Sequence, residues 1–443
     1  MIGGAELYDD LVARGLVHQC TDEATARAAL TAGTSAYIGF DPTADSLHVG
    51  SLQQIVLLRR LQLAGSRPIA LVGGGTGLIG DPSGKSAERT LLDGEAVARN
   101  AAGIRDQLAR FLDFDGPAAA TLQNNVDWLG GLGLLEFLRD VGKHFSVNAM
   151  VQRDSVRTRL ESREQGISYT EFSYMLLQAY DFLVLYRDHG CRAQLGGSDQ
   201  WGNIVSGIDL IRRHLGGEAA LAETDAPFGL TSPLVTTRSG TKFGKTEQGT
   251  IWLDAARTSP YALYQFWLGA DDAEVDAFLR RFTMMPVAEI EALMARHAEQ
   301  PAQRTAQREL AREVVTMAHG EEGLRAAERA TSVLFTGKVQ GMPAAELESI
   351  FADVPSSELP LAAFEAEGRP LRLLLVGDDR PFASNGEAKR KLKEGAVRIN
   401  GVAAPGDLAA PIGQDALIEG RLAVIKVGKK QTYLVRLTAG ERA

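Results

Sequence analysis

Short apolar runs alternate with helical patterns through the first half of this chain, and few folds accommodate that alternation. Residues 35–40 and 68–72 are apolar runs typical of strands, and residues 49–64 between them carry apolar side chains at helical spacing. The alternation continues with helical patterns at 95–111, 171–187 and 203–215 and with a strand pattern at 191–195. Strands and helices in this order predict an α/β domain in which helices cover both faces of a parallel sheet.

The chain changes character after Pro233. Residues 236–249 form a polar, glycine-rich segment with lysines, and residues 261–334 carry helical patterns that Pro301 interrupts. We interpret 342–370 as a linker because turn-forming residues break up its pattern. A compact α+β pattern follows, with a helix at 388–394 and paired strands at 423–427 and 432–437.

Basic residues are unevenly distributed along the chain. The formal net charge is −9, which alone argues against a nucleic-acid partner, because binding to phosphates needs local positive charge. Two basic clusters nevertheless lie near the C-terminal end: Lys389, Arg390, Lys391, Lys393 and Arg398, and then Lys426, Lys429, Lys430 and Arg436. Each cluster is either a solvated charged surface or a surface that binds nucleic acid.

Cysteine content and hydropathy indicate the compartment. Cys20 and Cys191 alone do not make a disulfide framework, and no Cys/His cluster suggests a zinc site, so we expect no protein-bound metal. No run approaches the roughly 18 apolar residues that a membrane-spanning helix needs. Residues 1–15 are acidic and poor in apolar side chains, unlike a secretory signal. A cytoplasmic protein with no membrane partner is therefore expected.

Residues 41–51, Asp-Pro-Thr-Ala-Asp-Ser-Leu-His-Val-Gly-Ser, lie between the first predicted strand and the next helix. Parallel sheets bind ligands at such positions, and a helix N-terminus offers N–H groups and a positive dipole end to phosphate. His48 can donate a hydrogen bond to a phosphate oxygen, and Gly50 allows a flat base to approach the backbone. The alternative is an ordinary helix start capped by Asp45 or Ser46.

A second glycine-rich loop, residues 73–84, follows an apolar strand and contains Asp81. It leads to two basic residues, Lys85 and Arg89. The loop fits neither G-x-G-x-x-G nor a P-loop, so a tight structural turn and a binding loop are both open interpretations.

Residues 241–246, Thr-Lys-Phe-Gly-Lys-Thr, place Lys242 and Lys245 around a glycine. Two lysines in a mobile loop suit a triphosphate, whose charge they can help to neutralise in the transition state. The alternative is a solvated loop without a ligand.

The helical pattern at 171–187 contains a polar stripe. Tyr174, Gln178 and Asp181 are spaced i, i+4 and i+7, so they share one face of a helix that is otherwise rich in apolar residues. A buried polar stripe is costly unless it is hydrogen-bonded. The stripe is therefore either a structural network or the polar wall of a pocket for a ligand with an ammonium or hydroxyl group.

The joint presence and order of these motifs is far more specific than any one of them. The His-Val-Gly-Ser element after Asp-Pro-Thr resembles the first signature of class I aminoacyl-tRNA synthetases, and Lys-Phe-Gly-Lys-Thr resembles the tyrosine-enzyme form of the second. Segments at 78–84, 141–148, 171–181 and 196–203 complete a close resemblance to bacterial tyrosyl-tRNA synthetases. The resemblance covers nearly the whole chain, including a C-terminal module similar to a small RNA-binding domain.

The resemblance implies a Rossmann-like catalytic domain at 1–232, a linker with the lysine loop at 233–259, a helical anticodon-binding domain at 260–345 and a C-terminal RNA-binding domain at 370–438. It implies that L-tyrosine is activated with ATP and Mg²⁺ to tyrosyl-adenylate, and is then transferred to the 3′ end of tRNA(Tyr). Because family members are homodimers, a homodimer is expected.

The resemblance also implies roles for individual residues. The tyrosine pocket would contain Tyr37, Asp81, Tyr174, Gln178, Asp181, Gln194 and Gln200. Tyr37 and Asp181 would bind the phenolic hydroxyl, while Asp81, Tyr174 and Gln178 would hold the α-ammonium. ATP would be bound by Asp41, Gly50, Ser51, Lys85, Arg89, Asp199 and Lys245, and the catalytic groups at its phosphates would be Thr43, His48, Lys242 and Lys245. The tRNA would be bound by Lys389, Arg390, Lys391, Lys393, Arg398, Lys429 and Lys430.

Two positions depart from the commonest family pattern. Ser51 stands where the first signature usually ends in His, and Ile38 stands where a small polar residue is common. Both positions face the ATP ribose in the family, and Ile38 cannot donate a hydrogen bond there. We therefore expect somewhat weaker ATP binding and retained activity.

Three other functions remain to be distinguished. A tryptophan-specific synthetase would share the core, but Tyr37 and Asp181 favour a phenol, and such enzymes usually lack the C-terminal module. A non-catalytic RNA-binding protein would have no need of Lys242 and Lys245. A different adenylyl-transferring enzyme would have no use for the two RNA-binding regions.

Overall fold

The computed structural model describes residues 3–81, 93–161, 166–217, 225–235, 243–246, 249–336, 339, 341–351, 354–428 and 431–438. The chain forms two compact units. The first contains Met1–Arg257 together with Leu268–Ala318, and the second contains Thr258–Trp267 together with His319–Ala443. The division expected from the sequence, at 1–232, 233–259, 260–345 and 370–438, stays a prediction.

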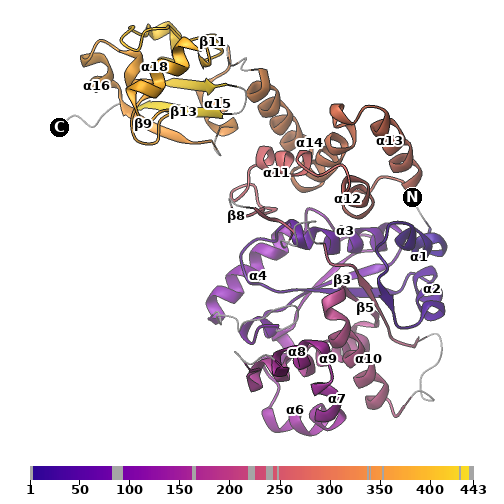
Figure 1. Cartoon of the computed structure of the whole chain (residues 1–443). Coiled ribbons are helices and arrows are strands. Elements are labelled where there is room, and N and C mark those ends of the chain that lie inside the picture. The colour runs from indigo at the N-terminus through magenta and orange to yellow at the C-terminus, as the bar shows by residue number, and fades with distance from the viewer. Residues whose placement is uncertain are drawn as a thin grey trace. The chain divides into compact units, whose positions relative to one another are not determined.

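A six-stranded sheet is the centre of the first unit. Its order is β1-β6-β5-β2-β3-β4; β1 is antiparallel to β6 and all other neighbours are parallel, which confirms the predicted parallel sheet. The strands are β1 Gln19–Cys20, β2 Ser35–Phe40, β3 Arg67–Val72, β4 Thr121–Asn124, β5 Cys191–Gly197 and β6 Phe228–Ser232. In Figure 1, α3 lies above this sheet and α9 and α10 lie below it, so helices cover both faces.

The helices of this unit follow the predicted alternation. They are α1 Gly4–Ala13, α2 Glu23–Thr31, α3 Val49–Leu63, α4 Gly94–Leu108, α5 Val126–Leu129, α6 Leu134–Asp140, α7 Val147–Val151, α8 Asp154–Glu161, α9 Tyr169–His189, α10 Trp201–His214, α12 Val275–Phe282 and α13 Val287–Glu299. A capping box of Ser168 and Glu171 begins α9, and Gly190 ends it in a left-handed conformation at φ 61°. Both ends of the helix with the polar stripe are thus fixed by local sequence.

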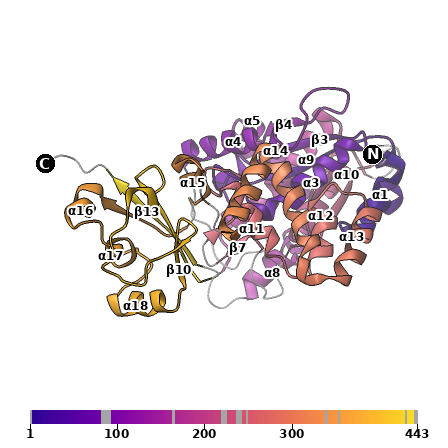
Figure 2. The same ribbon diagram turned by 90° about the horizontal axis from the view of Figure 1, so that it is seen from above.

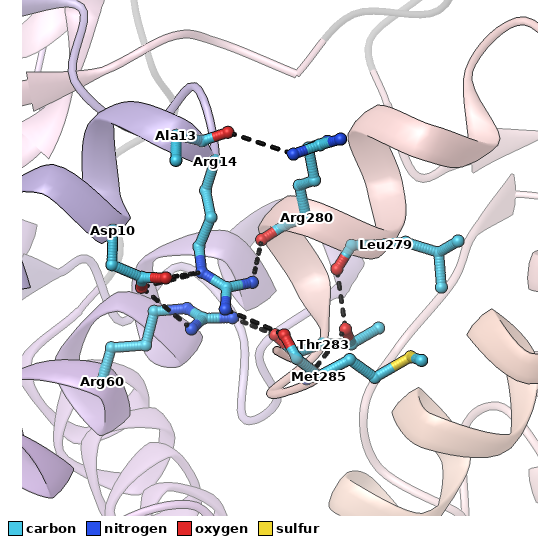
Figure 3. Close-up of polar contacts among 8 residues, drawn as sticks. All are labelled: Asp10, Ala13, Arg14, Arg60, Leu279, Arg280, Thr283 and Met285. Atoms are coloured by element: carbon cyan, nitrogen blue, oxygen red, sulfur yellow. Dashed lines mark hydrogen bonds and ion pairs between the residues drawn. The ribbon is translucent and has the colours of Figure 1, made fainter. Parts of the chain in front are cut away.

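A buried charge cluster connects α1, α3 and the end of α12 within the first unit (Figure 3). The Arg14 Nε donates to both carboxylate oxygens of Asp10 at 2.8 Å, and an Arg60 nitrogen lies 3.5 Å from the same carboxylate. The two guanidinium groups also donate to backbone carbonyls, those of Arg280 and Met285 from Arg14 and that of Thr283 from Arg60. Figures 1 and 2 both show α12 beside α3, where this cluster holds it.

One carboxylate serves two guanidinium groups in this cluster. Arg14 is 2% exposed and Arg60 is 5% exposed, so both are removed from water. Burial lowers the pKa of Arg60 to about 9, and the neighbouring Arg14 lowers it further while Asp10 opposes the shift. The stability of this packing therefore depends on Asp10.

The second unit contains a five-stranded sheet in the order β11-β10-β12-β13-β9, in which only β13 and β9 are parallel. Its strands are β9 Ser356–Pro360, β10 Val397–Ile399, β11 Val402–Ala403, β12 Leu422–Val427 and β13 Gln431–Thr438, and its helices are α15 Ala344–Ile350, α16 Leu361–Ala366, α17 Leu371–Leu375 and α18 Asn385–Lys393. The paired strands and the helix expected near the C-terminal end are confirmed.

Two helices extend across the limits of the units. They are α11 Pro260–Leu268 and α14 Thr305–Thr336. Gly320 breaks α14 with φ 69° and ψ −179°, a conformation that suits glycine. Pro301 lies in the short turn between α13 and α14, as its position in the sequence predicts.

The linker expected at 342–370 is wrong. This segment forms α15, β9 and α16, and β9 pairs with β13 along its whole length. Leu359 and Phe364 are 4% and 0% exposed and belong to the core under the sheet. Turn-forming residues interrupt the pattern because three short elements follow one another, so no single periodicity lasts long enough to detect.

Within the described residues, no helix has both the length and the apolar character needed to cross a membrane.

Candidate active site

His48 begins the helix that follows the first parallel strand. It is the N-cap of α3, and its Nδ1 accepts a hydrogen bond of 3.0 Å from the N–H of Gly50. Capping by Asp45 or Ser46 is wrong, since Asp45 pairs with Arg257 and the Ser46 hydroxyl donates to a backbone carbonyl. In a neutral imidazole whose Nδ1 accepts, the proton is on Nε2, so His48 is prepared to donate from that nitrogen.

Tyr37 and Asp181 lie together in the core beneath the sheet. Tyr37 is on β2 and Asp181 is on α9, and they are 1% and 2% exposed. Burial and then the Asp181 carboxylate raise the pKa of the Tyr37 hydroxyl well above its usual value. Among the described residues, none provides a hydrogen-bond partner for that hydroxyl, which is unusual for a fully buried phenol.

Two residues that the sequence did not single out hold the Asp181 carboxylate in place. Asn125 Nδ2 donates to one carboxylate oxygen at 2.9 Å, and Trp128 Nε1 donates to the other at 2.7 Å. Both lie just after β4, at the same end of the sheet as the His48 loop. A polar residue after a parallel strand is a recognisable signal, but it requires that β4 be identified first.

The rest of the polar stripe is also hydrogen-bonded. Gln178 donates to Gln200 at 3.1 Å, Gln200 donates to Asp81 at 2.7 Å, and Asn203 donates to Gln178 at 2.9 Å. The interpretation of the stripe as a structural network is thus confirmed for these contacts. Asn203 is the member that sequence reasoning missed, although it closes the Gly-Gly-Ser-Asp-Gln-Trp-Gly-Asn segment.

Negative charge surrounds the Tyr174 hydroxyl, which is hydrogen-bonded to Thr76. Burial raises its pKa well above the usual value, and three carboxylates raise it further. These carboxylates belong to Asp41, Asp81 and Asp181. Such an environment favours a cationic ligand group.

The central strand leaves space on one face. Gly39 is exposed although β2 lies between β3 and β5, and no described atom lies within 4 Å of the position that a Cβ would occupy. On β5, Gln194 is 2% exposed, and its Oε1 is without a hydrogen-bond partner among the described residues. An open backbone, an unpartnered phenol and an unpartnered amide oxygen are what a site for a polar ligand requires.

Other predicted ATP contacts lie around the carboxyl ends of the strands. Asp41 and Ser51 are half-buried, Thr43 and Asp199 are exposed, and Ile38 is buried on β2. A Cβ on Gly50 would lie 2.7 Å from Cε1 of the His48 ring, so this glycine makes room for the protein's own imidazole.

The lysine loop returns to the start of α3. Its described part contains β7 Lys245–Thr246 and β8 Gly249–Thr250, a short antiparallel pair, and the ring of Phe243 stacks on Phe282 at 5.4 Å. A Cβ on Gly244 would lie 2.5 Å from Val49, so the loop packs closely against the first turn of α3. The predicted contacts Lys242, Lys85 and Arg89 lie outside the described residues.

The predicted tRNA-binding residues gather mainly on one helix of the second unit. Lys389, Arg390 and Lys393 are exposed on α18 and line a hollow there, while Lys391 pairs with Glu394 at 2.8 Å. Arg398 is exposed on β10. Lys429 and Lys430 lie outside the described residues.

The Asp181 carboxyl has a much higher pKa than aspartic acid usually has. Burial raises its pKa from 3.8 to about 7, against the hydrogen bonds from Asn125 and Trp128. As pH rises between these values, the unfolded chain releases a proton that the folded chain keeps, so folding is progressively destabilised. From pH 5 to pH 7, the free energy of unfolding of the wild type should fall relative to that of Asp181→Asn by about 2–3 kcal/mol. Urea unfolding of both proteins measures this, and a difference that does not change with pH contradicts it.

Comparison with known proteins gives matches across the chain. The family profile "tRNA synthetases class I (W and Y)" matches residues 31–336, and the profile "Tyrosine--tRNA ligase SYY-like C-terminal domain" matches residues 346–435. Tyrosine–tRNA ligases of Bacillus caldotenax and Geobacillus stearothermophilus are each 51% identical over 435 residues, covering 97% of this chain and 99% of theirs. A C-terminally truncated mitochondrial tyrosyl-tRNA synthetase of Aspergillus nidulans superposes with a TM-score of 0.67 at 33% identity, covering 74% of this chain and 94% of that one.

Proposed function

The chain belongs to the class I tyrosine–tRNA ligases, and from that premise we propose how its residues carry out the reaction. The enzyme activates L-tyrosine with ATP to tyrosyl-adenylate, releasing pyrophosphate, and then transfers the tyrosyl group to the 3′ end of tRNA(Tyr). The site has to recognise a phenol and an ammonium, hold a triphosphate, and stabilise charge at phosphorus.

We propose that the buried pair of Tyr37 and Asp181 binds the substrate phenol. The observation that carries this proposal is the Tyr37 hydroxyl, which is fully buried, lies beside the Asp181 carboxylate and is unpartnered among the described residues. A substrate hydroxyl can donate to Asp181 and accept from Tyr37, which satisfies both groups at once. Asn125 and Trp128 keep the carboxylate oriented for that contact.

The α-ammonium of tyrosine is assigned to Asp81, Tyr174 and Gln178. The carboxylates that surround the Tyr174 hydroxyl supply the negative charge, and the amide chain from Gln178 through Gln200 supplies oxygen acceptors. Gln194 completes the wall of the same pocket with its unpartnered oxygen.

The first step needs no covalent enzyme intermediate. The tyrosine carboxylate attacks the α-phosphate of ATP, a new oxygen–phosphorus bond forms, and pyrophosphate leaves with the electrons of the broken bond. The enzyme contributes positioning and charge stabilisation. We assign His48 and Thr43, with Lys242 and Lys245, to the phosphates, and Asp41, Gly50, Ser51, Lys85, Arg89 and Asp199 to the rest of ATP. Mg²⁺ enters with ATP as part of the substrate and offsets phosphate charge.

In the second step, a ribose hydroxyl at the 3′ end of tRNA attacks the tyrosyl carbonyl and displaces AMP. We propose that the exposed basic residues of α18, together with Arg398, Lys429 and Lys430, bind the tRNA through its phosphates. This gives the uneven distribution of charge in an acidic chain a function. We place the enzyme in the cytoplasm, where translation takes place.

We propose a homodimer that uses an apolar surface of the first unit. Helices α6 to α9 pack around a small core of their own that contains Met150, Val156 and Met175. The large apolar residues that remain exposed on the described parts of these helices include Leu134 at 71%, Leu135 at 81%, Val147 at 61% and Tyr169 at 75%. Such a concentration of exposed apolar side chains is uncommon on a monomer and typical of an interface.

The dimer proposal makes a test possible at Leu135. Leu135→Asp places a charge at the most exposed of these apolar residues, and we expect the dissociation constant of the dimer to rise at least about tenfold, because a buried unpaired charge is costly. Sedimentation velocity of the full chain over a range of concentrations measures this. Val12→Asp is the matched control, since Val12 is 50% exposed on α1. Equal dissociation of both variants, or a monomeric wild type, contradicts the proposal.

Tyrosine-dependent exchange of pyrophosphate with ATP tests the proposed site. We expect exchange with tyrosine, at least about a hundredfold less with phenylalanine and tryptophan, and none without Mg²⁺. Exchange that is equally fast with phenylalanine contradicts the assignment of Tyr37 and Asp181 to the phenol.

A further inference from the structure

The segment that leaves the lysine loop pairs with the segment that contains His48. His48 and Trp252 lie directly opposite each other as an antiparallel bridge, with one backbone hydrogen bond on either side. The two bonds join the Val49 N–H to the Ile251 carbonyl at 3.0 Å and the Leu253 N–H to the Leu47 carbonyl at 2.9 Å. The backbone therefore fixes where Trp252 stands relative to His48.

This pairing brings the two rings together. The bonds belong to the flanking residues, so His48 and Trp252 form a non-hydrogen-bonded pair, in which facing side chains are closest. The imidazole and indole centroids are 6.1 Å apart at 65°, an edge-to-face contact. Leu47 and Leu253, the neighbours on the opposite face, are 5% and 1% exposed, so the core holds the register of the pair.

The imidazole also contacts Gly50. The Gly50 N–H donates to Nδ1, and the ring lies so close that a Cβ at Gly50 would be 2.7 Å from Cε1. Gly50 thus limits the position of the imidazole ring, and Trp252 contacts it. With Nδ1 accepting, Nε2 carries the proton of the neutral form.

Trp252 is itself held by a residue that contacts the His48 loop. The Arg257 guanidinium lies 4.7 Å from the centre of the indole ring and forms an ion pair with Asp45. Arg257 and Asp45 are 40% and 53% exposed, so this pair adds little to stability. Its effect is to limit the orientation of the indole.

We propose that Trp252 is a positioning residue that orients the His48 imidazole toward the phosphates of ATP. The proposal rests on the proposed role of His48 at the phosphates. The segment that contains Trp252 is also hydrogen-bonded to the lysine loop. The Ile251 N–H donates to the Gly244 carbonyl at 2.9 Å, next to Lys245. The segment at 251–253 is therefore hydrogen-bonded both to the lysine loop and to the segment that contains His48.

A double-mutant cycle in the full chain tests whether Trp252 acts through His48. The measurement is tyrosine-dependent ATP–pyrophosphate exchange, with kcat and the KM of each substrate determined for every variant. We expect Trp252→Ala to lower kcat about tenfold and to leave the tyrosine KM within about twofold, whereas Trp252→Phe keeps a ring and restores most of the rate. In a His48→Ala background, Trp252→Ala should lower kcat by less than about twofold further.

Arg257→Gln provides a second variant at an exposed position, where the fold tolerates change. We expect it to lower kcat about threefold in the wild type and not measurably in the His48→Ala background. Additive effects of Trp252→Ala or Arg257→Gln with His48→Ala overturn the inference and leave the role of His48 intact. Unchanged exchange in His48→Ala alone overturns both that role and the inference.

Discussion

Asp181→Asn should lower kcat/KM for tyrosine activation by about a hundredfold to a thousandfold, with the ATP KM unchanged. The amide keeps the size of the carboxylate but has only one acceptor oxygen. The N–H groups of Asn125 and Trp128 already donate to both carboxylate oxygens. In the variant, an NH₂ group faces one of these donors, and the substrate hydroxyl loses an acceptor oxygen in a buried site.

Pyrophosphate exchange at varied tyrosine and ATP concentrations measures this effect. Asp188→Asn is the matched control, because it makes the same change on the same helix at an exposed residue paired with Arg187. The control should differ from wild type by less than about twofold. A rise in the ATP KM, with tyrosine kinetics unaffected, contradicts the assignment of Asp181 to the phenol.

Asp10→Asn should destabilise the first unit by about 3–5 kcal/mol. The substitution removes the negative charge that Arg14 and Arg60 share, and among the described residues it leaves both buried guanidinium groups with backbone carbonyls and one neutral amide oxygen as partners. Two buried positive charges without a counter-charge repel each other and cannot be solvated. Urea unfolding, followed by circular dichroism, measures the loss.

The matched control for this prediction is Asp276→Asn. Asp276 pairs with Arg280 one helical turn away on α12, with its side chain 44% exposed. Because solvent screens this pair, its loss should cost less than about 1 kcal/mol. If both variants lose equal stability, burial of the Asp10 cluster is not what matters. That outcome would make the cluster equivalent to a surface ion pair.

Local pattern predicted the parts of the site that lie on regular elements. The strand at 35–40 and the helix that carries Tyr174, Gln178 and Asp181 have clear periodicities, so the faces of these residues follow from spacing alone. The lysine loop and the His48 loop were found as motifs, and their proximity follows from the pairing of His48 with Trp252.

The remaining residues were missed for identifiable reasons. Asn125 and Trp128 follow β4, a strand of four residues at the edge of the sheet that is too short to show a pattern. Asp10 and Arg60 are far apart in sequence, and nothing local indicates that these charges are buried together. Long-range pairing of this kind depends on how α12 returns to α1 and α3, which a single sequence does not reveal.

Each of the two units is made of two separate stretches of the chain, and this determines when each can be completed during synthesis. Residues 258–267 belong to the second unit, yet the ribosome must next deliver 268–318, which complete the first. At a translation rate of about 5–20 residues per second, several seconds pass between the synthesis of α11 and that of its partners from 319 onward. During that interval Leu263, Tyr264 and Trp267, all buried in the finished protein, are exposed on a nascent chain. These three apolar side chains are therefore buried only after the second unit has been synthesised.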